Sequence, residues 1–274
     1  MDEPGSYPLG YTEEEAGRLT SQAAFLEDLT EDVLRRAGIR SGMHVLDLGC
    51  GVGDVSLLAA RLVGETGSVL GIDRSPSSIE TARRRTTTLG VRTVQFETSE
   101  LDTFDTAQTF DAVIGRLVLL YQSDPVATLR RFRKFLVPNG VIAFQEVNIE
   151  DAMQLPASET FERVRSWFLG ALAASGTETN MGNKLLSTFL GAGLPRPTMI
   201  MAVRVESGPN SYTYAHLAGV IRSMLPLLER TGLATAEEVT IDTLADRLRQ
   251  EAIANECVTF SPHLVGAWSR LPKS

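Results

Sequence analysis

Residues 45–54 of the chain read VLDLGCGVGD. The apolar start of this stretch predicts a buried parallel strand, and Gly49, Gly51 and Gly53 predict a tight turn into a helix over residues 55–62. Glycine suits such a turn because a side chain would keep the backbone away from a ligand and because glycine reaches the required dihedral angles cheaply. The stretch therefore predicts a strand-to-helix turn that cradles a nucleotide.

The spacing of the glycines bears on the kind of nucleotide. In the dinucleotide fingerprint G-x-G-x-x-G, counted from Gly49, the third glycine would fall at position 54, where this chain has Asp54. A carboxylate at a helix N-terminus would repel a pyrophosphate, whereas it would not repel an ammonium or a sulfonium. The spacing therefore favours a cationic cofactor and disfavours a nicotinamide oxidoreductase.

Residues 47–53, DLGCGVG, resemble motif I of the class I S-adenosylmethionine (SAM)-dependent methyltransferases, and the resemblance covers most of the chain. Its nearest type is the bacterial small-molecule methyltransferase of secondary metabolism. The resemblance implies an α/β fold with a doubly wound, Rossmann-like sheet of seven strands, the last of them antiparallel, and helical cap insertions. It also implies three regions: a helical lid over 1–40, a SAM-binding core over 41–147, and the remaining sheet with its cap over 148–274. The cap, expected at about 150–180 and 208–254, would form the acceptor pocket.

The order of apolar and amphipathic segments supports this fold, because alternating strands and helices indicate a parallel sheet. Further core strands are expected at 69–72, 91–96, 110–114 and 141–144, with helices at 75–88 and 124–136. The later segments are expected to be helices at 158–175, 181–190, 212–230 and 242–254, and strands at 197–205 and 258–268. Two helices are expected ahead of the first strand, one opening with a capping box at 12–15 and one over 31–37.

Composition narrows the class of partner. The net charge of −8 leaves no basic surface for a phosphate backbone, so a nucleic-acid acceptor is disfavoured. Two cysteines, Cys50 and Cys257, are too few for a disulfide framework or a cysteine-rich metal site. Residues 1–4 lack the layout of a signal peptide, and no apolar run reaches the roughly 18 residues of a membrane span. We expect a cytoplasmic protein with a small-molecule partner, no membrane partner and no metal, and we leave a homo-oligomer open.

Asp73 follows the apolar residues 69–72 and can accept hydrogen bonds from both hydroxyls of a ribose, which is the role that the resemblance gives it. Its other possible role, as an N-cap, is already filled by Ser75. The resemblance also assigns an acidic residue after 91–96 to the adenine, and we expect Glu100, with Ser99 as the alternative register. Asp47 and the Gly49 carbonyl would receive the ammonium of SAM, directly or through water.

Arg116 and Leu117 leave the strand at 110–114 on the side of the ligand crevice, so they should meet the methionine part of SAM; Arg116 could equally pair with a surface acid. Polar side chains of the first helices could face the ligand or simply be solvated. The complete set of expected cofactor contacts is Tyr11, Gln22, Asp47, Gly49, Cys50, Gly51, Gly53, Asp73, Arg74, Ser99, Glu100, Arg116 and Leu117. Cys50 is expected to pack there and not to act as a nucleophile.

Two residues are candidate bases. His216 lies in the cap segment near Tyr212, where an imidazole could deprotonate an acceptor hydroxyl at neutral pH, although it could also be an ordinary polar residue of a helix. Glu146, after the strand at 141–144, is a comparable candidate. A dedicated catalytic group is not required, since holding donor and acceptor in line in a dry pocket can itself accelerate methyl transfer.

The function expected is SAM-dependent methyl transfer to a small, largely apolar acceptor, with S-adenosylhomocysteine as the product. The sequence leaves open the acceptor and whether oxygen, nitrogen or carbon is methylated. Two alternatives remain. Methylation of an isoprenoid or polyene carbon could be coupled to cyclisation, or the chain could be a SAM-binding module without catalysis.

Overall fold

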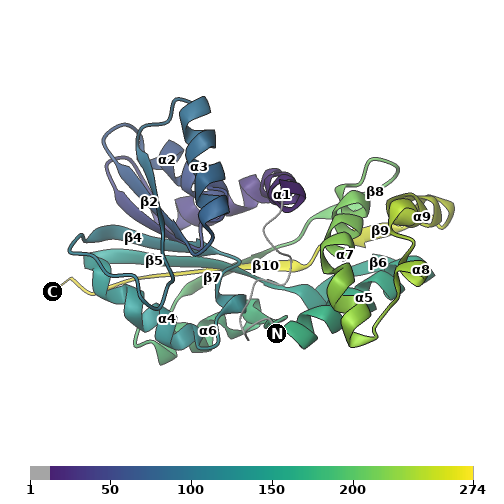
Figure 1. Cartoon of the computed structure of the whole chain (residues 1–274). Coiled ribbons are helices and arrows are strands. Elements are labelled where there is room, and N and C mark those ends of the chain that lie inside the picture. The colour runs from purple at the N-terminus through teal and green to yellow at the C-terminus, as the bar shows by residue number, and fades with distance from the viewer. Residues whose placement is uncertain (1–12, 274) are drawn as a thin grey trace.

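The computed structural model describes residues 13–273, with side chains from residue 21 onward. Its centre is a seven-stranded sheet in the order β3-β2-β1-β4-β5-β10-β7 (Figure 1). The strands are β1 (His44–Leu48), β2 (Ser68–Asp73), β3 (Val94–Thr98), β4 (Phe110–Arg116), β5 (Leu136–Asn148), β7 (Thr198–Ala202) and β10 (His263–Arg270). β1 to β5 pair in parallel, whereas β10 is antiparallel to both of its neighbours. The structure thus confirms the predicted doubly wound sheet with an antiparallel last strand.

Helices cover both faces of this sheet (Figure 1). One face carries α1 (Glu13–Ala37), α2 (Asp54–Val63) and α3 (Pro76–Thr88), and the other carries α4 (Pro125–Phe132) and α6 (Met181–Gly191). Side chains alternate along each strand, so Val45 and Ala143 belong to the core under the first set of helices, whereas Leu46 and Phe144 belong to the core under the second. Burial on both faces explains why the core strands are continuously apolar.

The cap is built on a second, smaller sheet. Its three antiparallel strands stand in the order β6 (Met153–Leu155), β9 (Val258–Phe260) and β8 (Val205–Ser207). Four helices complete the cap, namely α5 (Glu159–Ser175), α7 (Tyr212–Thr231), α8 (Ala236–Val239) and α9 (Ile241–Ala254). The short 3₁₀ turns are η1 (Leu119–Tyr121), η2 (Arg133–Phe135) and η3 (Ile149–Asp151). Figure 1 shows the cap at the right of the view, beyond the end of the main sheet at which β10 begins.

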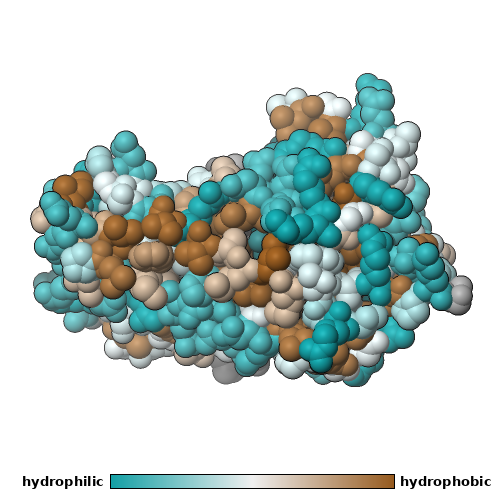
Figure 2. Space-filling model, turned by 180° about the vertical axis from the view of Figure 1, so that it is seen from behind, coloured by the Kyte–Doolittle hydropathy of each residue, from teal (hydrophilic) through white to brown (hydrophobic). Residues whose placement is uncertain are grey.

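One face of the small sheet presents apolar side chains to solvent. Met153 and Val205 both pair in register with Phe260, so the three residues share a face, and Met153 and Val205 are exposed. Figure 2, which views the molecule from behind, shows hydrophobic residues gathered over its left half, which is the cap side after the turn.

The helices before β1 differ from the prediction. The described residues 13–37 form a single helix, α1, and not two, because no glycine or proline interrupts residues 26–31. Thr30 stays within the helix, and its hydroxyl lies 3.0 Å from the Leu26 carbonyl one turn earlier. The expected capping box at 12–15 begins outside the described residues.

Strands near the cap also differ in extent. β5 begins at Leu136 and runs through Pro138, Asn139 and Gly140, which were expected to separate a helix from a strand, and Asn139 adopts a φ of 60°. The pairing of β5 with β4 shifts register at Phe110, so the extra residues form a bulge. α7 likewise continues through the exposed Pro226, where solvent can satisfy the carbonyl that the proline cannot bond.

The two last predicted strands each divide between the two sheets. Residues 197–205 become β7 and the start of β8, and residues 258–268 become β9 and most of β10. Both divisions occur at one point, where the Ser261 amide donates to the Arg204 carbonyl at 2.8 Å and the Arg204 amide donates to Ser261 Oγ at 2.9 Å. Pro262, directly after this crossing, cannot donate to a ladder, which favours a break there.

Candidate cofactor and acceptor site

A cavity of about 2180 Å³ lies between the core and the cap. Pockets for a single small molecule usually measure roughly 300–1000 Å³, so this cavity has room for a cofactor and an acceptor together. The predicted site residues that line it are Gln22, Gly49, Cys50, Gly51, Asp73, Arg74, Ser99, Glu100, Arg116, Leu117 and His216. Asp47, Gly53 and Glu146 lie behind this lining, and Tyr11 lies outside the described residues.

The glycine turn has two parts with different functions. Gly51 has a φ of 53°, and a Cβ placed there would meet no atom within 4 Å, so the turn is open toward the cavity. A Cβ on Gly53 would lie 2.8 Å from the Phe96 ring and 3.1 Å from the Ala82 Cβ. Gly53 therefore permits close packing of the turn against β3 and α3, and it does not contact the cavity.

Asp73 is held in place by the same turn. Its Oδ2 accepts from the Gly51 amide at 2.9 Å and its Oδ1 accepts from the Ser75 amide at 2.8 Å. Burial raises the pKa of Asp73, and these two N–H groups oppose that effect. Ser75 caps α3 by accepting from the Ser78 amide at 3.2 Å, as expected. Since Asp73 lines the cavity, its remaining lone pairs are available to hydroxyl donors of a ligand.

Asp47 is 1% exposed at the end of β1. Its Oδ2 accepts from Ser56 Oγ at 2.6 Å, and burial raises its pKa to about 7 although Ser56 and Arg116 oppose the rise. A cation arriving at the turn would favour the ionised form of this carboxyl. The Cys50 thiol is also buried, and its burial together with Asp47 raises its pKa, which agrees with packing and not with a nucleophilic role.

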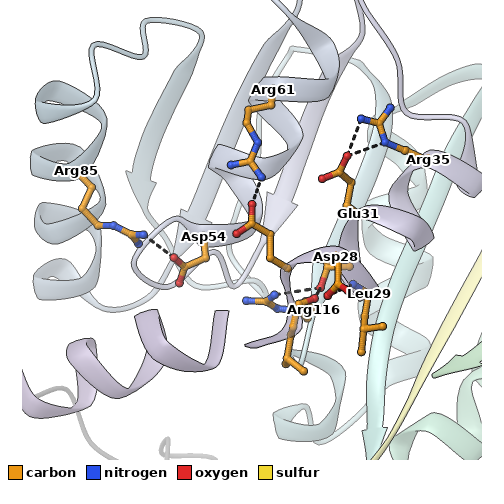
Figure 3. A network of polar contacts seen from close by, with 11 residues as sticks. Asp28, Leu29, Glu31, Arg35, Asp54, Arg61, Arg85 and Arg116 are labelled. Atoms are coloured by element: carbon orange, nitrogen blue, oxygen red, sulfur yellow. Dashed lines mark hydrogen bonds and ion pairs between the residues drawn. The ribbon is translucent and has the colours of Figure 1, made fainter. Parts of the chain in front are cut away.

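The charge at the start of α2 differs from the sequence-based expectation. Asp54 does line the cavity, but its Oδ1 accepts from Arg85 Nη2 at 2.6 Å, and Arg85 Nη1 also donates to the Val52 carbonyl (Figure 3). Arg85 therefore neutralises much of the charge that was expected to repel a pyrophosphate. The glycine spacing, and not the charge of Asp54, therefore distinguishes this turn from one that binds a pyrophosphate.

Ser99 and Glu100 both reach the cavity after β3, so the structure leaves both registers available for an adenine contact. The Ser99 amide donates to the Asp73 carbonyl at 2.9 Å, which ties this loop to the end of β2. Arg74 also lines the cavity, and its charge opposes the rise that burial causes in the pKa of Asp73.

Arg116 joins the core to α1. Its Nη1 donates to Thr30 Oγ1 at 3.1 Å, and Thr30 Oγ1 lies 2.8 Å from Gln145 Oε1 on β5. Burial lowers the pKa of Arg116, whereas Asp54, Asp47 and Glu27 act in the opposite direction. The guanidinium thus lies in an acidic surrounding at the cavity wall.

The turn after Arg116 is unusual. Leu117 has a φ of 54°, in the left-handed region that costs energy for a leucine, and it lines the cavity. Glu146 stabilises the next residues, because its Oε1 accepts from the Val118 amide at 3.0 Å and from the Leu119 amide at 2.8 Å. Glu146 is fully buried, and burial raises its pKa to about 8. Its position favours a role in shaping this turn over a role as a base.

His216 lines the cap side of the cavity on α7. Its Nδ1 lies 2.8 Å from the Tyr212 hydroxyl, and the two rings stack with centroids 5.0 Å apart. Tyr212 in turn stacks on Phe25 of α1 with centroids 4.3 Å apart, and Arg204 lies over the Phe25 ring. This stack joins α1 to the cap at the wall of the cavity.

Sequence reasoning missed Thr30, Gln145 and Phe25 as parts of the site. The polar pair Gln145 and Glu146 within an apolar strand was a signal for the contact between Gln145 and Thr30, because polar residues in a buried strand require partners. Phe25 gave no such signal. Within residues 13–273, no group of three or more His, Cys, Asp or Glu side chains could hold a metal, and no helix is long and apolar enough to cross a membrane.

The family model of the methyltransferase domain matches residues 39–189, more than half of the chain. The chain belongs to this family. The matched part of the methyltransferase domain contains every expected cofactor contact from Asp47 to Leu117, whereas the cap helix with His216 lies beyond it. Membership confirms the predicted SAM-dependent methyltransferase family and its cofactor, SAM.

Curated relatives match a shorter stretch. Aklanonic acid methyltransferase DauC of Streptomyces sp. strain C5 is 37% identical over 120 residues, 43% of this chain and 51% of the relative. Demethylmenaquinone methyltransferase of Staphylococcus aureus is 32% identical over 117 residues, 42% of this chain and 48% of the relative. The chain thus spans about half the length of the curated relatives that it matches. The structure of the cyclase SpnF, at 19% identity and a TM-score of 0.54, covers 90% of this chain and 81% of SpnF, and supports the fold alone.

Proposed function

We propose that this chain transfers a methyl group from SAM to a small, largely apolar acceptor and releases S-adenosylhomocysteine. The observation that carries the proposal is the open turn at Gly51, with Asp73 fixed beside it, in a cavity that also reaches an apolar cap. One wall then holds the donor and the opposite wall holds the acceptor.

The core wall fits the donor group by group. Asp73 would accept from the ribose hydroxyls, and Glu100 or Ser99 would accept from the adenine amine. Arg116 would bind the carboxylate, and Asp47, lying behind the lining, would stabilise the ammonium through water. When bound, SAM supplies a methyl group already activated on a sulfonium.

The cap wall would hold the acceptor and exclude water. Apolar side chains from α5 and α7 line this part of the cavity: Phe161, Phe168, Leu169, Leu217, Val220 and Leu227. A dry, apolar wall keeps an acceptor in a fixed orientation, which is the main requirement of a reaction that depends on alignment.

His216 would remove the proton of an acceptor hydroxyl. Its imidazole lines the cavity, and the Tyr212 hydroxyl lies 2.8 Å from Nδ1, so a contact between two side chains one helical turn apart helps to position the ring. The stack on Phe25 keeps the imidazole in one orientation next to the lid. Glu146, buried behind the lining, would contribute through the turn that it holds.

Relatives support a small-molecule acceptor. Two relatives are methyltransferases named for aklanonic acid and demethylmenaquinone, and the net charge of −8 disfavours a nucleic acid. The cyclisation alternative has only the apolar cap in its favour. A product that is one methyl heavier with an unchanged ring count would exclude it.

The direct experiment is calorimetric titration with S-adenosylhomocysteine, followed by incubation with SAM and a panel of apolar acceptors. We expect binding, and turnover with at least one acceptor. The absence of binding would refute the proposal, whereas binding without any turnover across the panel would favour a SAM-binding module.

A further inference from the structure

Acidic side chains line one wall of the cavity and not the other. The core side carries five carboxylates, Asp54, Asp73, Glu80, Glu100 and Asp102, together with Arg74, Arg84 and Arg116. On the cap side, from residue 147 onward, the described lining contains Arg165, Arg222 and Arg230 but no aspartate or glutamate. This division stands out in a chain with a net charge of −8, because a random surface would place acids on both walls.

Arg165 is the most informative of the three arginines. It lies half-buried on α5 between Phe161 and Phe168, which also line the cavity. Its Nη2 donates to the Glu150 carbonyl at 2.5 Å, and its Nη1 lies 3.8 Å from Glu162, a weak contact. Its Nε is buried and has no hydrogen-bond acceptor among the described residues.

Because Nε is closed off from the cavity, a ligand would meet the terminal N–H groups of Arg165, and a carboxylate is the acceptor that pairs best with them. The backbone bond to Glu150 holds the side chain in place, although the Glu150 carboxylate also interacts with its charge. Preorganised donors of this kind increase both affinity and specificity.

Arg222 and Arg230 add positive potential at the rim. Both are exposed on α7, which packs against α5, and Arg222 pairs with the largely exposed Asp242 at 2.9 Å. Exposed charges of one sign around an opening mainly steer a charged ligand toward it. Arg165 would therefore contact the charged ligand, and Arg222 and Arg230 would attract it toward the cavity.

We propose that the acceptor is an apolar carboxylic acid whose carboxylate binds Arg165 while its apolar body packs on the α5 and α7 side chains. This inference rests on the proposed function, and it specifies the charge of the acceptor. It also places the cationic donor on the wall that carries all five carboxylates of the lining and the anionic acceptor on the wall that carries none.

Two probes with the same aromatic body test it. Titrations of the S-adenosylhomocysteine-saturated protein compare 2-naphthoate, which is ionised at pH 7.5, with the neutral 2-naphthamide. We expect the naphthoate to bind about tenfold more tightly, as one charge-assisted hydrogen bond allows. The variant Arg165→Gln should lose that preference and keep its affinity for the naphthamide, and Arg165→Lys should recover part of it.

Arg163→Gln is the matched control, because Arg163 lies on the same helix, pairs with Glu159 and does not line this cavity. It should behave as the parent protein does. Equal binding of the two probes, absence of naphthoate binding, or the same losses in both variants would overturn the inference. Absence of S-adenosylhomocysteine binding would instead refute the proposed function, so the two failures are distinguishable.

Discussion

Replacement of Glu146 by glutamine tests how the turn after β4 is held. The glutamine carbonyl can accept from the Val118 and Leu119 amides as Glu146 Oε1 does, at 3.0 and 2.8 Å. What the substitution removes is a titratable proton at a site that is fully buried. The variant should therefore fold, and it should differ from the parent mainly in the pH dependence of its stability.

The magnitude follows from the pKa of Glu146, which burial raises from 4.5 to about 8. Between pH 4.5 and about 8, Glu146 holds a proton in the native state that it has lost in the unfolded chain. Its contribution to the free energy of unfolding is therefore fully present below pH 4.5 and is lost as the pH rises through about 8. At about 1.4 kcal/mol for each pKa unit, the loss amounts to about 5 kcal/mol for this one group. Asp47, with a pKa raised to about 7, acts in the same direction and remains in the variant.

Urea unfolding of the parent and of Glu146→Gln at pH 6 and pH 9 measures the difference. Between pH 6 and pH 9, the free energy of unfolding should fall less in Glu146→Gln than in the parent. At pH 9 the variant should be the more stable protein by a few kcal/mol. Parallel pH dependences would refute the reasoning, as would a loss above about 2 kcal/mol at pH 6, the cost expected if the amide cannot replace the carboxyl. Methyl transfer retained by the variant would also exclude Glu146 as the base.

Three further predictions concern the cavity. Asp73→Asn should weaken binding of S-adenosylhomocysteine at least tenfold in calorimetry, because the amide cannot accept from both ribose hydroxyls. The control Asp105→Asn, at an exposed position, should leave the affinity unchanged. Equal affinities of the Asp73→Asn variant and the parent would contradict the ribose assignment. Gly53→Ala, at a φ of 88° and with no room for a Cβ, should lower the free energy of unfolding by about 2 kcal/mol or more in urea, and an unchanged midpoint would show that the packing can relax. Tyr212→Phe should lower kcat for a hydroxyl acceptor about tenfold and His216→Gln about a hundredfold or more, without change in S-adenosylhomocysteine affinity; an unaltered kcat would remove the imidazole from the chemistry.

The cofactor wall could be predicted from the sequence because its signals are local. Three glycines in five residues require a turn, and an aspartate at the end of the next strand meets that turn in any parallel pairing of β1 with β2. Ser75 followed by Pro76 likewise specified the start of α3. These features depend on short stretches whose geometry is set by backbone conformation.

The acceptor wall could not be predicted in the same way. The small sheet uses three-residue strands, which are too short for an alternating pattern to be recognised. The charge division became visible only when α5 and α7 were placed around one cavity, since Arg165 and Arg222 are far apart in sequence. The function of Asp54 was misjudged for a related reason, because its partner Arg85 lies on another helix.

The double crossing at Arg204 and Ser261 limits how the cap can be exchanged. Two of the segments that join the main sheet to the small one meet here, and the Arg204 and Ser261 amides each bond to the other segment. The cap is consequently no detachable module, and transplanting it from a homologue would cut β7 or β10 out of the central sheet. Altered selectivity is better sought by exchanging single side chains on the inner faces of α5 and α7, which leaves both junction strands intact.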